Sequence, residues 1–167
     1  GPDRVLLLHG TTWENKRWPD AAWATLARRL RDTGRIALTT WGDAEERARA
    51  EALHRDAGVE VIPRLPLREL VGTLRGVRAV VAADTGLVHL AAALGVPTLG
   101  LYGPTDPQRT GVLGLRASIL ASRYHCVPCL RRSCREDPDR RSALWPPCLG
   151  AVTAEDAWTV LERWLTP

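Results

Sequence analysis

The sequence predicts an α/β fold, a Rossmann-like doubly wound parallel sheet, and three observations support this prediction. Short apolar runs alternate with longer segments whose apolar residues recur at helical spacing. Gly and Pro residues fall between these segments, where turns are expected. The apolar runs lack polar alternation, which is typical of strands buried on both faces of a parallel sheet. Because crossovers in such a sheet are right-handed, we expect a ligand beyond the carboxyl ends of the strands.

The first part of the chain predicts three strands with helices between them. The strands are residues 4–9, 36–40 and 59–62. A helix after the first strand is expected to end near Gly34, and a second helix runs over residues 44–57 and ends at Gly58. Glycine suits both ends because it readily takes the left-handed conformation of a helix C-cap.

The second part continues the alternation and then breaks it. It predicts a helix over residues 67–74, a strand over 79–83, a helix over 87–94, a strand over 98–102 and a final amphipathic helix over 154–165. Between the last two elements, residues 124–149 are rich in Arg, Pro and Cys. We expect this segment to be an irregular insertion and not a second core.

Length and composition predict a single globular domain over residues 3–167, with Gly1 and Pro2 as the remnant of an expression tag. No apolar run approaches the roughly 20 residues of a membrane-spanning helix. A formal net charge of +4 favours anionic partners: a nucleotide, a phosphorylated lipid or a nucleic acid. Charge alone does not choose among them.

Two loops that follow predicted strands carry groups suited to phosphate. The first contains Thr11, Thr12 and Lys16, whose hydroxyls and ammonium can donate hydrogen bonds to an anion, although composition alone favours an ordinary polar loop. The second contains Thr85 and Gly86 at a helix start, where unpaired backbone N–H groups attract negative charge. The first loop is neither a Walker A loop nor a GxGxxG motif.

Three further residues or turns near the second loop have two interpretations each. Asp84 suits either a ligand contact or a plain N-terminal cap. His89 is predicted on an apolar helix, where a histidine is more often partly buried and hydrogen-bonded within the protein than in contact with a ligand. The Gly- and Pro-rich residues 103–107 predict a rigid turn first, and the alternative is that this turn lines the cleft.

The stretch DTGLVHLAAALGVP at residues 84–97, followed by LYGPTDP at 101–107, resembles the signature of the family 9 glycosyltransferases, the lipopolysaccharide heptosyltransferases. Thr11, Thr12, Lys16 and Trp18-Pro19 resemble the donor-phosphate loop of the same family. The resemblance extends over nearly the whole chain from Arg4 onward. It implies a GT-B enzyme, of which this chain is the C-terminal donor-binding domain, and an acceptor domain that precedes it.

The resemblance also implies a donor, an acceptor and roles for single residues. The donor is ADP-heptose and the acceptor is the lipopolysaccharide inner core, which places the enzyme in the cytoplasm, at the inner face of the inner membrane. The diphosphate is expected at Thr11, Thr12, Lys16, Thr85 and Gly86, and the donor sugar at Asp84 and His89. The nucleoside is expected at Glu45, with Glu46 close behind it, and at Leu65.

The family is inverting, so a base must deprotonate the acceptor hydroxyl. That base is expected in the preceding domain, with no catalytic residue in this one. Lys16 and the helix start at Thr85 would neutralise the ADP leaving group, and we expect no metal to be required there. Without the other domain, the fragment is expected to bind donor weakly and to catalyse nothing.

Four cysteines, Cys126, Cys129, Cys134 and Cys148, have the spacing C-x2-C-x4-C-x13-C. Four thiolates that begin with CxxC can form a structural zinc or iron site, while reduced thiols or a disulfide remain open alternatives. A catalytic cysteine is not expected.

Two other functions compete with donor binding. Five arginines lie around the cysteines, as in zinc-containing modules that bind nucleic acid: Arg131, Arg132, Arg135, Arg140 and Arg141. The insertion interleaves Pro where such a module would stack aromatic rings, so we expect no nucleic acid. The same arginines suit anionic core phosphates or the membrane surface. The second alternative is a GT-B domain that uses another nucleotide sugar.

Overall fold

The structure, a computed structural model, describes residues 3–166, so the predicted tag remnant at Gly1 and Pro2 lies outside the described residues. Within the described range, one sheet of six strands has the order β3-β2-β1-β4-β5-β6. Every neighbouring pair is parallel. This 3-2-1-4-5-6 order is that of a doubly wound Rossmann-like sheet, so the predicted fold class is confirmed.

The strands are β1 (Arg4–Leu8), β2 (Ile36–Thr39), β3 (Glu60–Val61), β4 (Ala79–Ala83), β5 (Thr98–Tyr102) and β6 (Ala117–Ala121). The longer helices are α1 (Asp20–Asp32), α2 (Ala44–Ala57), α3 (Leu67–Arg75), α4 (Gly86–Ala93) and α7 (Ala154–Leu165). Three shorter elements are the 3-10 turn η1 (Glu14–Lys16), α5 (Pro107–Thr110) and α6 (Pro147–Gly150).

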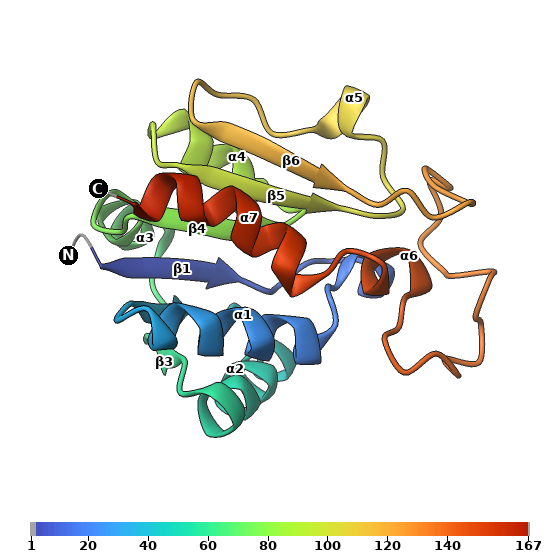
Figure 1. The fold of residues 1–167 in the computed structure, drawn as a ribbon, viewed down its shortest axis with the longest axis horizontal. Helices are drawn as coiled ribbons and strands as arrows, with labels where there is room; N and C mark the ends of the chain where they lie inside the picture. The colour runs from blue at the N-terminus through green and yellow to red at the C-terminus, as the bar shows by residue number, and fades with distance from the viewer. Residues whose placement is uncertain (1–2, 167) are drawn as a thin grey trace.

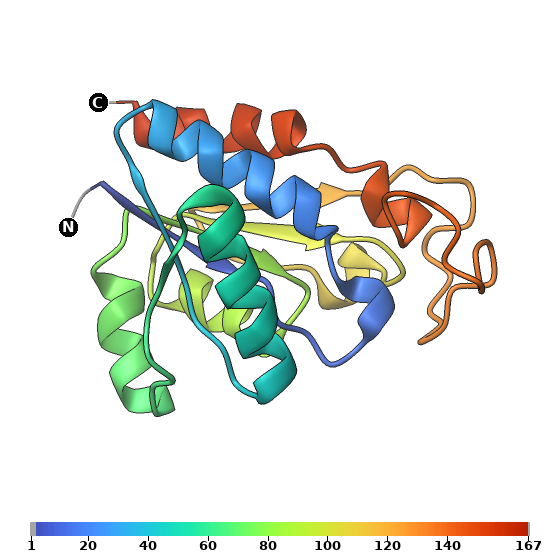
Figure 2. The ribbon, with the colours of Figure 1, turned by 90° about the horizontal axis from the view of Figure 1, so that it is seen from below.

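Helices cover both faces of the sheet (Figures 1 and 2). Along β1, Val5 and Leu7 belong to the core shared with α1 and α7, whereas Leu6 and Leu8 belong to the core on the side of α3 and α4. All four side chains are buried. Successive strand residues point to opposite faces, so burial of both faces explains why the strands are apolar without alternation.

The structure contains elements that the sequence did not predict. The edge strand β6 (ASILA) has five residues, as β1, β4 and β5 do, but it is only half-buried and contains the polar Ser118. The short elements η1, α5 and α6 also carry little periodicity, because each is a single turn. In contrast, α2 has the predicted bounds and ends at Gly58, which has a φ of +72°.

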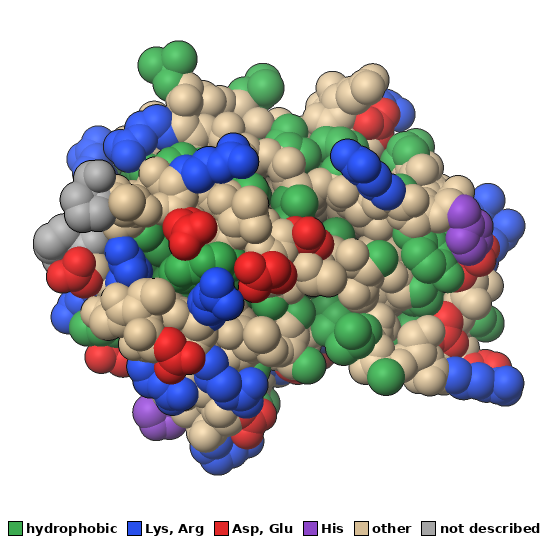
Figure 3. Space-filling view, in the orientation of Figure 1, with side chains coloured by type: hydrophobic (Ala, Val, Ile, Leu, Met, Phe, Trp, Pro, Cys, Tyr) green, Lys and Arg blue, Asp and Glu red, His purple; other side chains and the backbone are tan. Residues whose placement is uncertain are grey.

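The cysteine-rich segment lies beyond the ends of the strands, at the right of Figure 1. Residues 122–146 form turns and bends but no helix or strand. On the face covered by α1 and α7, acidic and basic side chains are interspersed (Figure 3), so this face carries no continuous basic stripe of the kind that binds nucleic acid. In the part of the chain from residue 3 to 166, no helix combines the length and apolarity that crossing a bilayer requires.

The start of α7 provides a test of the fold. Thr153 and Asp156 form a capping box, in which the Asp156 N–H donates to Thr153 Oγ1 at 3.1 Å and the Thr153 N–H donates to Asp156 Oδ2 at 2.9 Å. Thr153→Ala should lower the free energy of unfolding by about 1 kcal/mol at pH 7, measured by urea denaturation. Thr159→Ala, on the exposed side of the same helix, should change it much less.

This stabilisation should also depend on pH. The hydrogen bonds from Thr153 lower the pKa of Asp156 below its usual value. A lowered carboxyl pKa stabilises the fold above the unfolded pKa and ceases to do so as the pH falls through the folded one. The difference between wild type and Thr153→Ala should therefore shrink below about pH 4. Equal stability of the two proteins at pH 7 would contradict the capping assignment.

Candidate functional site

Two adjoining pockets lie at the carboxyl ends of the strands, where the fold class places a ligand. The leucine pocket, of about 360 Å³, is lined by Leu8, Leu65, Leu67, Leu70 and Leu87 together with Glu46 in the first turn of α2 and residues of the β2–α2 loop. The lysine pocket, of about 460 Å³, contains Lys16, Asp84, His89 and Thr105. Thr11, Thr12 and Thr85 line both pockets. These threonines therefore form the boundary between a chamber with five leucines, which Asp43, Glu46 and Arg64 also line, and a chamber that contains Lys16 and Asp84.

The lysine pocket joins two predicted loops through an ion pair. Lys16 Nζ, at the end of η1, lies 2.9 Å from Asp84 Oδ2, directly after β4. The Thr105 hydroxyl donates to the same Asp84 oxygen at 2.7 Å. The Thr11 hydroxyl contacts the Asp84 carbonyl oxygen at 3.3 Å. Lys16 and Thr105 thus both hold the Asp84 carboxylate in position. The loops that contain Lys16 and Thr85 meet at one pocket, as the sequence predicts.

The start of α4 opens onto the same pocket. Thr85 is the N-cap residue, and no side chain makes a capping hydrogen bond there. The interpretation of Asp84 as a plain helix cap is therefore wrong, because its carboxylate is engaged by Lys16 and Thr105 instead. An uncapped helix start presents backbone N–H groups and partial positive charge to an anion. Gly86, the first residue of α4, is exposed beside it.

His89 and Trp13 also face the lysine pocket. His89 is exposed, so the interpretation as a partly buried, satisfied histidine does not hold. Trp13 was not predicted as a site residue, and the Lys16 ammonium lies 4.3 Å from the centre of its ring. A cation over an aromatic face is attracted to it, so Trp13 helps to set the position of Lys16.

In the leucine pocket, the acidic residue is Glu46 and not Glu45. The Glu46 carboxylate accepts a hydrogen bond from the Gly42 N–H at 2.7 Å. It lies so close to Gly10 that a Cβ atom added there would stand 2.2 Å from Glu46 Oε1. Glycine at position 10 is therefore what allows this carboxylate to enter the pocket.

Glu45 lies outside both pockets and forms an ion pair with Arg17. The hydrogen bond from Arg17 holds the pKa of Glu45 below its usual value. The position of the helix cap distinguishes the two glutamates: Asp43 is the N-cap of α2, which makes Glu46 the third helical residue. A side chain at that position turns back over the helix start, whereas Glu45 points away.

His9, at the end of β1, is structural. One ring nitrogen is hydrogen-bonded to Thr39 Oγ1 at 2.9 Å and the other to the Glu46 carbonyl oxygen at 3.1 Å. Burial, reinforced by the nearby charge of Arg49, lowers the pKa of His9. The neutral ring therefore ties β1 to β2 and to the start of α2, which holds Glu46 in place.

The four cysteines line a third cavity of about 310 Å³. No two of them form a disulfide. Burial raises the pKa of the Cys148 thiol to about 12 and also raises that of Cys126. A nucleophilic cysteine needs the opposite shift, so neither residue is activated for catalysis.

Comparison with known proteins identifies the family. The model of glycosyltransferase family 9 (heptosyltransferase) matches residues 2–139. The chain is 48% identical over 141 residues to lipopolysaccharide heptosyltransferase 1 of Pseudomonas aeruginosa, a match that covers 83% of this chain and 39% of that protein. The chain thus spans about two fifths of the length of this relative.

Solved structures agree in fold. The Escherichia coli heptosyltransferase WaaC with ADP has a TM-score of 0.79 at 30% identity, covering 98% of this chain and 44% of that one. The same enzyme with ADP-2-deoxy-2-fluoro heptose has a TM-score of 0.76 at 29% identity, covering 97% and 43%. The family match and the fold lead to one conclusion: the chain belongs to glycosyltransferase family 9, the heptosyltransferases.

Proposed function

We propose that this chain is the donor-binding domain of an inverting glycosyltransferase that transfers heptose from ADP-heptose to the lipopolysaccharide inner core. The observation that carries the proposal is the pair of adjoining pockets, one with five leucines and the Glu46 carboxylate and one with the Lys16 ammonium, with Thr11, Thr12 and Thr85 between them. A nucleotide sugar has the same division: an apolar base, a charged diphosphate and a hydroxylated sugar. The relatives solved with ADP and with an ADP-heptose analogue support this choice of donor.

The nucleoside occupies the leucine pocket in this proposal. Leu65 flanks the adenine, and the Glu46 carboxylate accepts hydrogen bonds from the ribose hydroxyls. Glu46 replaces Glu45 in this role, because Glu45 does not line the pocket. The diphosphate then lies at the three threonines and the start of α4, and the sugar extends toward Asp84 and His89.

Lys16 has the electrostatic role in the transfer step. As the bond between the anomeric carbon and ADP breaks, negative charge develops on the leaving phosphate and must be stabilised. The Lys16 ammonium has three N–H donors, so it can keep its contact with Asp84 while it binds a phosphate oxygen. The backbone N–H groups at Thr85 and Gly86 add to this stabilisation, and no metal at the diphosphate is required.

The remainder of the reaction belongs to the longer protein. An inverting transfer needs a base on the acceptor side, and we place it in an N-terminal acceptor domain that closes over the donor pockets. By itself, this domain binds the donor weakly and transfers nothing. The arginines of the insertion contact anionic core phosphates or the inner face of the inner membrane.

The Lys16 assignment predicts the outcome of a calorimetric titration. ADP-heptose and ADP should bind more tightly than UDP-GlcNAc, and Lys16→Ala should weaken ADP binding about 10- to 100-fold, as expected for a lost charged hydrogen bond. Arg163→Ala is the matched control, since this exposed cation lies in the last turn of α7. Preferential binding of UDP-GlcNAc would instead support a GT-B domain with another nucleotide sugar.

The two glutamates predict a second contrast. Glu46→Gln should weaken ADP binding about tenfold, because the ribose hydroxyls lose a charged acceptor. Glu45→Gln should leave the dissociation constant almost unchanged, since Glu45 pairs with Arg17 and neither residue lines either pocket. Circular dichroism verifies that both variants are folded. A larger loss of ADP affinity in Glu45→Gln than in Glu46→Gln would assign the ribose contact to Glu45.

A further inference from the structure

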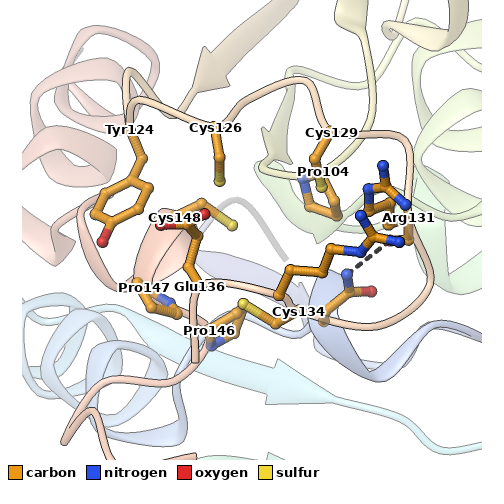
Figure 4. A pocket seen from close by; sticks show the side chains of 12 residues that line it. Pro104, Tyr124, Cys126, Cys129, Arg131, Cys134, Glu136, Pro146, Pro147 and Cys148 are labelled. Atoms are coloured by element: carbon orange, nitrogen blue, oxygen red, sulfur yellow. Dashed lines mark hydrogen bonds between the residues drawn. The ribbon is translucent and has the colours of Figure 1, made fainter. Parts of the chain in front are cut away.

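All four cysteines converge on one cavity although up to 22 positions of sequence separate them. Cys126 and Cys129 come from the segment after β6, Cys134 from the following turn, and Cys148 from α6. Figure 4 shows the four side chains around a common space. Residues 122–146 have no helix or strand, so isolated hydrogen bonds take the place of a regular ladder, among them those from the Arg141 and Ser142 N–H groups to the Asp137 carboxylate.

The same segment also contacts η1 and the neighbouring Trp13, in the loop that carries Lys16. Asn15 Nδ2, in η1, donates to the Arg131 carbonyl oxygen at 2.7 Å, and Asn15 also lines the cysteine cavity. Arg140 forms an ion pair with Glu14. The Arg132 guanidinium lies 5.3 Å from the ring centre of Trp13, the same ring that Lys16 contacts. η1 is thus held by the insertion on one side and by Asp84 on the other.

The insertion also contacts the loop after β5 and thereby reaches the lysine pocket. The Leu130 N–H donates to the Pro104 carbonyl oxygen at 2.8 Å, next to the Thr105 that fixes Asp84. Leu130 itself lines the lysine pocket. Any group that orders the cysteine segment therefore also orders the walls of the donor site.

We propose that Cys126, Cys129, Cys134 and Cys148 bind one thiolate-preferring metal ion, zinc or iron, and that this ion holds the insertion against η1. The donor set fits: four sulfur ligands that begin with CxxC are the ligands of tetrahedral structural sites. Each thiol that binds releases its proton to solvent. A divalent ion with four thiolates has a charge of −2; Arg131 and Arg135 line the same cavity and offset part of that charge, whereas Glu136, which also lines it, adds negative charge.

Metal binding requires the cavity to contract. Within residues 3–166, no three His, Cys, Asp or Glu side chains are already grouped closely enough to hold a metal ion. Zinc–sulfur bonds are about 2.3 Å long, so the ligands must approach a common centre. The irregular segment has no helix or strand that this movement would break, and its contacts from Arg131 to Asn15 and from Leu130 to Pro104 must persist during it.

The test begins with metal content. Elemental mass spectrometry of the purified protein should find about one zinc or iron atom per chain. The Cys134→Ser variant should contain no bound metal. Ser133→Ala, in the same exposed turn, is the matched control and should retain it. Reducing and non-reducing mass spectra detect disulfides. Wild-type protein without metal, or with two disulfides, would overturn the proposal.

The second arm tests the link to η1 without a nucleotide, so its failure is distinguishable from failure of the proposed function. Removal of the metal with a chelator should accelerate tryptic cleavage after Arg131, Arg132 or Arg135, and amide exchange in residues 14–17, by about tenfold. Asn15→Ala should keep the metal and the slow cleavage but lose the slow exchange. Metal removal that leaves exchange in residues 14–17 unchanged would overturn the role of the ion in ordering η1.

If the proposed function also holds, the chelated protein should bind ADP several-fold more weakly than the metal-loaded protein, and metal addition should restore the affinity. Ser133→Ala should respond like wild type. Unchanged ADP affinity after chelation, in a protein whose η1 has become mobile, would show that order in this loop does not support donor binding.

Discussion

The ion pair between Lys16 and Asp84 joins the two loops on which the candidate site depends. Lys16 follows β1 and Asp84 follows β4, and these strands are neighbours in the sheet. From β1 the chain winds outward through β2 and β3, whereas from β4 it winds the other way through β5 and β6. The pair therefore stands at the topological switch point, where a doubly wound sheet leaves a crevice for its ligand.

The position of this pair matters more than its contribution to stability. Both side chains are largely buried, with exposed fractions of 14% and 8%, so their attraction is offset by the loss of hydration. What the pair provides is a fixed ammonium group. Thr105 holds the carboxylate, the Trp13 ring lies against the ammonium, and the uncapped start of α4 is beside it. Such preorganisation is what an enzyme needs where charge develops in a transition state.

Much of the fold and part of the site could be predicted from the sequence. The central strands and longer helices have strong periodicity, and the loops with Lys16 and Thr85 follow strands, so their convergence followed from topology. The sequence does not distinguish Glu46 from Glu45, because neighbouring helical residues differ in the direction of their side chains, and this direction depends on the cap at Asp43. Trp13 and Thr105 act through contacts between distant loops, and β6 is a half-buried edge strand. Local pattern does not encode these features.

The central claim is that the Lys16 ammonium lies against the donor diphosphate. Lys16 is the only lysine in the sequence, so amine-selective acylation followed by peptide mass spectrometry reports on this position alone, with the N-terminal amine as an internal control. Saturating ADP should slow acylation of Lys16 and leave the N-terminal amine unaffected. Acylation of Lys16 at the same rate with and without bound ADP would contradict the claim.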